Sequence, residues 1–174
     1  MTEPGGTLGA AREPQAVIQS PLGRLGIRMA PHGVAGIDIL PSGVAVGHGP
    51  AAGPVVEVVA ALKRYFRDPR TPFDVPLSLS GTAFQQQVWA LLRLIPVGRT
   101  ITYASLAQQL TTSARAVGQA CRANPILIIV PCHRVVATRG LGGYLGGCQD
   151  WLGAKRWLLQ HEACTVEPGE DGCR

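Results

Sequence analysis

The segment with the richest chemistry is Ile129-Val-Pro-Cys-His-Arg-Val-Val136, in which Cys132 is followed directly by His133. A thiol is a weak nucleophile at its ordinary pKa of about 8.5, and a nearby imidazole can convert it to a thiolate. Neighbouring residues of an extended chain point to opposite faces. We therefore expect a turn at Pro131–Arg134 to bring Cys132 and His133 to one side. The alternative is a buried structural cysteine beside an unrelated histidine.

Two short predicted helices precede this segment. Thr102 is placed to cap a helix at 103–110 and Ser113 to cap one at 114–123, with a tight turn between them. This arrangement fits a DNA-binding helix-turn-helix, and it equally fits an ordinary αα-hairpin.

The chain that leads from the second helix to the cysteine also carries local signals. Asn124 precedes Pro125 and should end the helix, because a residue before proline avoids the helical region. The apolar run Ile126–Val130 predicts buried extended chain that delivers Cys132 to a fixed position.

The remaining elements follow from periodicity and turn signals. Short strands at 16–20, 25–29 and 34–40 suggest an antiparallel meander. A helix at 54–66 opens on Pro54 and should bury Val55, Val58, Val59, Leu62 and Phe66. Thr82 and Gln85 form a capping-box pattern before another helix, and a last helix is expected at 154–161. We predict a disordered tail at 1–14, an α/β domain at 15–77, a second domain at 78–164 and a flexible tail at 165–174.

Composition narrows the class of protein. The 174 residues are 46% hydrophobic, which is enough for a packed core and excludes wholesale disorder. The longest apolar run is too short to span a bilayer, and the first residues lack a secretory pattern. The five cysteines are odd in number and include no C-x-x-C, which argues against a disulfide framework or a zinc ribbon. We expect a cytoplasmic protein.

Charge is distributed unevenly along the chain. Residues 81–149 hold six arginines and no carboxylate, whereas the whole chain has a net charge of +5. Such a stretch creates a local positive field that suits a polyanion such as nucleic acid, although a generic basic surface is the other interpretation.

Several motifs together resemble one family. Pro131-Cys-His-Arg-Val-Val136 after Asn124-Pro125 is similar to the active-site signature of the O6-alkylguanine-DNA alkyltransferases. Further matches are Gly81-Thr-Ala-Phe-Gln-Gln-Gln-Val-Trp89, Ile95-Pro-Val-Gly-Arg-Thr100, Tyr103, Ala114-Arg-Ala-Val-Gly118, Gly142-Gly-Tyr-Leu-Gly-Gly147 and Lys155-Arg-Trp-Leu-Leu-Gln-His-Glu162. The resemblance implies an α/β (α+β) fold. Its N-terminal domain would be a ribonuclease-H-like antiparallel sheet, and its C-terminal domain would be mainly helical and winged helix-turn-helix-like.

The resemblance also implies a reaction. An alkyl group on O6 of guanine in DNA, and by extension on O4 of thymine, would pass irreversibly to Cys132. His133 would take the thiol proton, Glu162 would orient that imidazole, Asn124 would fix the active-site turn, and Tyr103 would donate to the base. No resolving cysteine or cofactor motif is apparent, so we expect one turnover per molecule, no cofactor and no metal.

Contacts with DNA are implied in the same way. Double-stranded DNA containing O6-alkylguanine would bind a monomer through the minor groove, with the damaged nucleotide flipped out and no membrane involved. Arg115 would fill the vacated stack, Tyr103 would crowd the phosphate, and Ala114, Ala116 and Gly118 would allow close approach. The other expected substrate or DNA contacts are Arg122, Pro131, Arg134, Val135, Tyr144 and Leu145.

Three departures from the family pattern stand out. The turn 111–113 is about two residues shorter than is common, Cys148–Leu152 reads as an insertion that carries Trp151, and the N-terminal zinc cysteines of some members are absent. A non-catalytic lesion-binding or regulatory protein on the same scaffold is the alternative function, and a cysteine hydrolase is a weaker third. The repair hypothesis requires an accessible Cys132 sulfur on the same side as the helices of 103–123.

Overall fold

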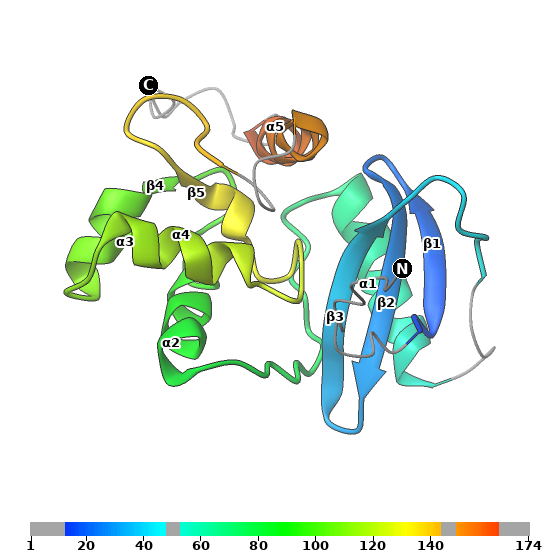
Figure 1. Cartoon of the computed structure of the whole chain (residues 1–174). Helices are drawn as coiled ribbons and strands as arrows, with labels where there is room; N and C mark the ends of the chain where they lie inside the picture. The colour runs from blue at the N-terminus through cyan, green and yellow to red at the C-terminus, as the bar shows by residue number, and fades with distance from the viewer. Residues whose placement is uncertain (1–12, 48–52, 144–148, 164–174) are drawn as a thin grey trace, which may run out of the picture.

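The computed structural model describes residues 13–47, 53–143 and 149–163 and has a mixed α/β fold (Figure 1). This fold class is the predicted one. Its strands and helices are β1 (Ala16–Ser20), β2 (Gly23–Ala30), β3 (Gly33–Leu40), α1 (Pro54–Arg67), α2 (Ala83–Leu92), β4 (Ile101–Thr102), α3 (Tyr103–Gln109), α4 (Ala114–Arg122), the 3₁₀ turn η1 (Cys132–Arg134), β5 (Val135–Val136) and α5 (Gln149–Ala163).

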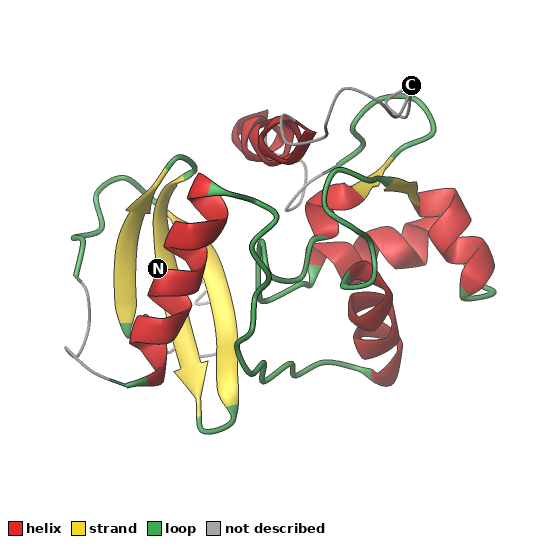
Figure 2. Ribbon diagram, turned by 180° about the vertical axis from the view of Figure 1, so that it is seen from behind, coloured by secondary structure: helices red, strands yellow, loops and turns green. Residues whose placement is uncertain are grey.

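The N-terminal unit is the expected antiparallel meander covered by one helix. The strands pair in the order β1-β2-β3, with tight turns between Ser20 and Gly23 and between Ala30 and Gly33. Figure 2 shows α1 lying across one face of this sheet. The ribonuclease-H-like assignment stays a prediction.

Helix α1 buries a slightly different face from the predicted one. Pro54 does occupy its first turn, where the missing N–H costs nothing. The buried stripe ends on Tyr65, which is 1% exposed, whereas Phe66 is only half-buried. The inward position at the end of this helix therefore belongs to a side chain that carries a hydroxyl group.

The proline-rich connection after α1 runs along the edge of β3. Val34 N–H donates to the Pro76 carbonyl and Ser78 N–H donates to the Val34 carbonyl, both at 2.8 Å. Gly33 has a φ of +139°, and a Cβ there would collide with the Pro76 carbonyl oxygen, so this crossing requires glycine. The domain boundary near residue 78 stays a prediction.

The C-terminal unit contains the predicted caps. Thr82 and Gln85 form the capping box of α2, Thr102 accepts from Ser105 N–H, and Ser113 accepts from Ala116 N–H. Helices α3 and α4 pack against each other across a four-residue connection, as a short helix pair should. In α2 the Trp89 Nε1–H group donates to the Ala120 carbonyl of α4 at 2.9 Å.

Strands β4 and β5 were not predicted, because each has only two residues. They pair in parallel, with Ile101 opposite Val135 and Thr102 opposite Val136. This pairing places the first residue of α3, Tyr103, beside the segment that follows Cys132.

Two sequence-based expectations are wrong. Ile126–Val130 is buried but is a compact turn rather than extended chain: Val130 N–H donates to the Ile126 carbonyl at 3.0 Å, and Ile128 has a φ of +73°. The last helix begins at Gln149 rather than Ala154, so Trp151 and Leu152 of the proposed insertion lie inside it. Across the described ranges, none of the helices combines the length and apolarity needed to cross a membrane.

Candidate active site

Asn124 organises the turn that leads to the cysteine. Its Oδ1 accepts from Ile126 N–H at 3.0 Å, and its Nδ2 donates to the Val130 carbonyl at 2.8 Å and to Cys132 Sγ at 3.2 Å. One buried amide thus replaces the backbone partners that a strand would have supplied, which explains why the apolar run folds as a turn. The same amide contacts the sulfur.

The sheet of the N-terminal unit holds this turn from the other side. Ile37 N–H donates to the Pro125 carbonyl at 2.9 Å, and Leu127 N–H donates to the Ile37 carbonyl at 3.2 Å. The turn is therefore fixed by the edge of β3 as well as by Asn124.

Cys132 and His133 form a 3₁₀ turn with Arg134, as the adjacency of the first two required. Cys132 is 2% exposed and His133 is fully buried. The accessible sulfur that the repair hypothesis requires is therefore not present in this structure, and a substrate reaches Cys132 only if the surrounding side chains move apart. Tyr144 and Leu145, the expected pocket residues, lie outside the described residues.

Glu162 of α5 is the centre of a buried hydrogen-bond network. Its Oε1 lies 2.8 Å from His133 Nε2 and accepts from Arg134 Nη2 at 2.8 Å and from the Tyr65 hydroxyl at 2.9 Å. Its Oε2 accepts from Arg134 Nε at 2.8 Å. Burial alone would raise the pKa of Glu162, but the hydrogen bonds and charges of His133 and Arg134 outweigh it and hold the pKa far below 4.5.

The ionised carboxylate defines the tautomer of His133. Because Glu162 Oε1 can only accept, His133 Nε2 carries the hydrogen and Nδ1 of the neutral ring is left as an acceptor. Among the described residues Nδ1 is a buried atom with no hydrogen-bond partner. Burial lowers the pKa of His133 below 6.5 despite the opposing effect of Glu162, which keeps the ring neutral and able to accept a proton.

Lys155 is a site residue that the sequence analysis missed. Its ammonium is completely buried and donates to the carbonyls of Val135 and Leu141 at 2.6 Å and of Gly143 at 3.1 Å. Burial lowers the pKa of Lys155 to about 8, while negative charge on Cys132 would raise it again. A cation in this position favours the thiolate form of Cys132.

A spacing signal could have identified Lys155. It lies three residues before Leu158 and seven before Glu162, so all three share one face of α5 and all three are buried. A lysine on the apolar stripe of a helix must have polar partners.

The backbone carbonyls of Val135, an expected substrate contact, and of Cys132 already have partners. The Val135 carbonyl accepts from Lys155, and the Cys132 carbonyl accepts from Val135 N–H, so only a second lone pair remains on each oxygen. Tyr103 is half-buried, and its hydroxyl donates to the Gly143 carbonyl at 3.1 Å. Burial raises the pKa of Tyr103 well above 10, so its hydroxyl remains a donor.

Arg134 is not placed to contact DNA, which corrects the sequence analysis. Its guanidinium is 8% exposed and is bound to Glu162 and to the Ile95 carbonyl. The other five arginines of the carboxylate-free stretch are exposed, namely Arg93, Arg99, Arg115, Arg122 and Arg139. Five of the six positive charges of this stretch therefore lie at the surface.

The expected DNA-facing residues of α4 lie at its surface. Ala114, Arg115 and Arg122 are exposed, and Ala116 and Gly118 are partly exposed. A Cβ added at Gly118 would meet no atom within 4 Å, so nothing within the chain requires glycine there.

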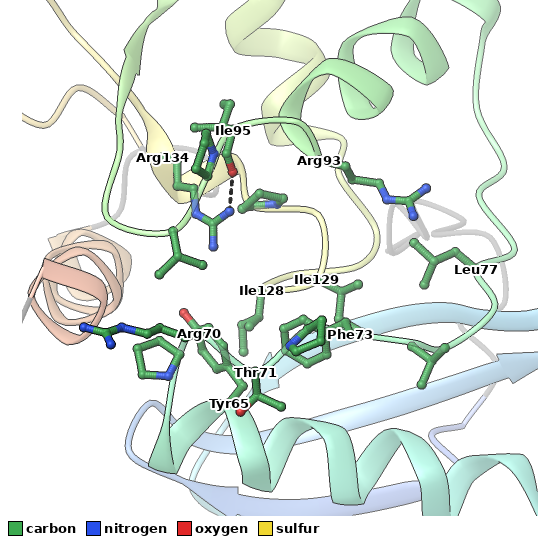
Figure 3. Close-up of a pocket in the computed structure, with 16 residues that line it drawn as sticks. Tyr65, Arg70, Thr71, Phe73, Leu77, Arg93, Ile95, Ile128, Ile129 and Arg134 are labelled. Carbon is green, nitrogen blue, oxygen red and sulfur yellow. Dashed lines mark hydrogen bonds between the residues drawn. The ribbon is translucent and has the colours of Figure 1, made fainter. Parts of the chain in front are cut away.

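Pro131 lines a cavity of about 330 Å³ (Figure 3). Residues of the 69–77 connection, of the 93–97 loop and of the 128–131 turn form its walls, together with Tyr65 and Arg134. Neither Cys132 nor His133 is among these lining residues. The cavity therefore lies behind the Glu162 network rather than at the nucleophile.

Comparison with known proteins reveals the family. Residues 83–164 match the sequence profile "6-O-methylguanine DNA methyltransferase, DNA binding domain". The chain is 36% identical over 182 residues to the methylated-DNA–protein-cysteine methyltransferase of Mus musculus, and the match covers 90% of this chain and 85% of that protein. It is 46% identical over 124 residues to the enzyme of that name from Mycobacterium leprae, with 70% and 73% covered.

The chain belongs to the methylated-DNA–protein-cysteine methyltransferase family. A crystal structure of Mycobacterium tuberculosis OGT in complex with DNA matches the fold with a TM-score of 0.71 and 39% identity, over 85% of this chain and 91% of that one. Family membership identifies the chain as a DNA-repair methyltransferase with a DNA-binding domain. Among the described residues no group of three histidines, cysteines or acids could hold a metal ion.

Proposed function

We propose that this protein removes the alkyl group from O6 of guanine in double-stranded DNA and retains it on Cys132. The observation that carries the proposal is the buried Nδ1 of His133, which has no hydrogen-bond partner among the described residues, on a ring whose Nε2 is held by Glu162. An unsatisfied polar atom in a buried network is costly and calls for a function. Here that function is acceptance of the thiol proton.

The chemistry balances with residues of this chain alone. The Cys132 thiol proton passes to His133 Nδ1, directly or through one water, and the thiolate attacks the saturated carbon attached to O6. A carbon–sulfur bond forms as the carbon–oxygen bond breaks, and guanine leaves with the electron pair and takes up the proton that the His133 imidazolium releases, through solvent. The thioether is stable, so each molecule reacts once. O4-alkylthymine presents the same kind of carbon and is the second expected substrate.

The Cys132 sulfur is supported as an anion from two sides. Asn124 Nδ2 donates to it at 3.2 Å, and the Lys155 ammonium adds positive charge nearby. Arg134 keeps Glu162 from acting as an uncompensated charge beside the imidazole. Burial raises the pKa of the second buried cysteine, Cys121, to about 12, although the charge of Lys155 partly opposes this shift.

DNA engagement is proposed to occur through α3 and α4. The base must leave the stack to reach a sulfur that is 2% exposed. Arg115 is exposed in the first turn of α4 and would occupy the vacated space from the minor groove. The helix pair meets the site through Tyr103, whose neighbours include the Gly143 carbonyl and the Lys155 ammonium at 5.5 Å from the ring centre. We expect one molecule of protein for each lesion.

The test is intact mass after mixing the protein with an oligonucleotide duplex that bears O6-methylguanine. We expect the mass of one added methyl group, located on Cys132 by peptide mapping, and no addition in Cys132→Ala. Cys121→Ala is the matched control, because it removes another buried cysteine and should still react. A protein that binds the duplex without gaining mass would favour a non-catalytic lesion binder, and repeated turnover would contradict the stoichiometric reaction.

A further inference from the structure

Helix α1 supplies a direct partner to the proposed proton relay, although it lies outside the matched segment 83–164. The Tyr65 hydroxyl donates to Glu162 Oε1 at 2.9 Å, and His133 Nε2 donates to the same oxygen. Tyr65 is 1% exposed. Burial and the charge of Glu162 raise the pKa of Tyr65 well above 10, so the hydroxyl remains a donor throughout the working pH range.

Tyr65 is bound to α5 at two consecutive residues. Its side chain reaches Glu162, and its backbone carbonyl accepts from His161 Nε2 at 2.9 Å. The Tyr65 and His161 rings also meet edge to face, with centroids 5.4 Å apart. In Figure 3 Tyr65 lies across the cavity from Arg134, the second residue that holds Glu162. The hydroxyl is thus fixed in direction by contacts that do not involve the carboxylate.

We propose that Tyr65 is a positioning residue that sets how strongly Glu162 Oε1 accepts from His133, and thereby the pH at which Cys132 becomes reactive. The role of the site in alkyl transfer rests on the proposed function, whereas the coupling between Tyr65 and Cys132 reactivity does not. The N-terminal unit would then tune the chemistry as well as support the fold.

The direction of the effect follows from the donors on one oxygen. Glu162 Oε1 accepts from Tyr65, His133 and Arg134 at once, and each donor reduces the negative charge that this oxygen presents to the other two. Removing the Tyr65 hydroxyl leaves more negative charge facing the imidazole, which favours imidazolium. Arg134 binds both carboxylate oxygens and keeps Glu162 in place without Tyr65.

The titratable and charged groups around this relay come from α1, α3, α4, η1 and α5, and they are Tyr65, Tyr103, Cys121, Cys132, His133, Arg134, Lys155, His161 and Glu162. Tyr65→Phe changes only one hydroxyl among them. A displaced pH profile in that variant therefore reports the donor itself rather than a change in the number of charges at neutral pH.

The experiment compares wild type with Tyr65→Phe. The rate of Cys132 alkylation by iodoacetamide is measured against pH by peptide mass spectrometry, together with methyl transfer from the O6-methylguanine duplex. We expect the acid limb of both profiles to move to higher pH by roughly half a unit, because a ring that is protonated more readily loses its neutral, proton-accepting form at a higher pH; this is a fraction of the one to three units that a neighbouring charge produces. Phe73→Leu is the control. The Phe73 ring packs on the Tyr65 ring, with centroids 5.3 Å apart, and carries no group that could donate to Glu162.

The outcomes separate the two proposals. An acid limb that is unchanged, or one that moves to lower pH, overturns the role of Tyr65 even if the variant melts at a lower temperature. A Phe73→Leu profile that moves as far as that of Tyr65→Phe overturns it as well. If wild type takes no methyl group from DNA, the proposed function fails, and the iodoacetamide profile still tests Tyr65.

Discussion

Replacing Glu162 with glutamine removes the only negative charge from the buried network around His133, as far as the described residues extend. The carboxylate is 1% exposed and receives hydrogen bonds from Tyr65, His133 and Arg134. Glutamine retains one acceptor oxygen and adds an NH₂ group that faces donors. Arg134 is itself buried and would keep its charge without a counter-charge.

The magnitude follows from that geometry. Removing one partner of a buried ion pair costs about 3–5 kcal/mol, because the other charge stays buried and unpaired. For a chain of this size each kcal/mol lowers Tm by about 2–4 °C, so we expect Glu162→Gln to lose roughly 6–20 °C. Glu57→Gln, an exposed carboxylate on α1, should stay within about 0.5 kcal/mol of wild type.

The pH dependence gives the prediction a second signature. The folded pKa of Glu162 lies far below its ordinary 4.5, because the hydrogen bonds and charges of His133 and Arg134 outweigh burial, which alone would raise it. Its stabilisation is therefore complete above pH 4.5 and is lost as the pH falls through the folded pKa, since the unfolded chain binds the proton first. Glu162→Gln lacks this pH-dependent stabilisation, so the difference in free energy of unfolding between wild type and the variant should become smaller in acid.

The assay is urea unfolding of wild type, Glu162→Gln, Arg134→Met and the double variant, at neutral pH and at about pH 4. Because each single variant leaves a buried charge behind, the double variant should cost less than the sum of the two. The buried-pair reasoning would be refuted if Glu162→Gln were as stable as Glu57→Gln. It would also be refuted if the stability losses of Glu162→Gln and Arg134→Met added up to the loss of the double variant.

Three further predictions concern the turn and the DNA-facing helix. Asn124→Ala should cost about 1–3 kcal/mol for each buried group left unpaired and slow Cys132 alkylation by iodoacetamide; a normal rate would remove Asn124 from the site. Arg115→Ala should slow methyl transfer from the O6-methylguanine duplex while the reaction with the free base O6-methylguanine is retained, and equal losses would contradict the finger role. Arg122→Ala should reduce the salt slope of duplex binding by about 0.9 if it contacts one phosphate, and an unchanged slope would exclude that contact.

Local chemistry in the sequence predicts much of this fold. Thr82, Thr102 and Ser113 cap the helices that they were expected to cap, because an N-cap needs only a side-chain oxygen at the right spacing. The three strands appear because their turn signals and alternation are short-range features. Adjacent Cys132 and His133 likewise required a turn, and a 3₁₀ turn is present.

The failures share a different cause. Ile126–Val130 has the composition of a buried strand, yet the amide of Asn124 and the edge of β3 hold it as a turn. Arg134 reads as one more positive charge in a basic stretch, yet its partner Glu162 lies 28 residues away. Periodicity and charge counting describe neighbours along the chain, and neither can identify a partner that only tertiary packing supplies.

In the proposed relay, the buried charge of Arg134 helps His133 to act as a base. An ionised Glu162 with only His133 as its partner would favour imidazolium, and a ring already protonated on Nδ1 could not accept the thiol proton. Arg134 binds both oxygens of that carboxylate and Tyr65 adds a third donor, so the charge that reaches the ring is reduced. Burial, which lowers the pKa of His133 most, and the charge of Arg134 together keep the ring neutral and able to accept the Cys132 proton in the proposed transfer. An arginine that the sequence suggested as a DNA contact would therefore serve, in the proposed relay, to keep His133 available.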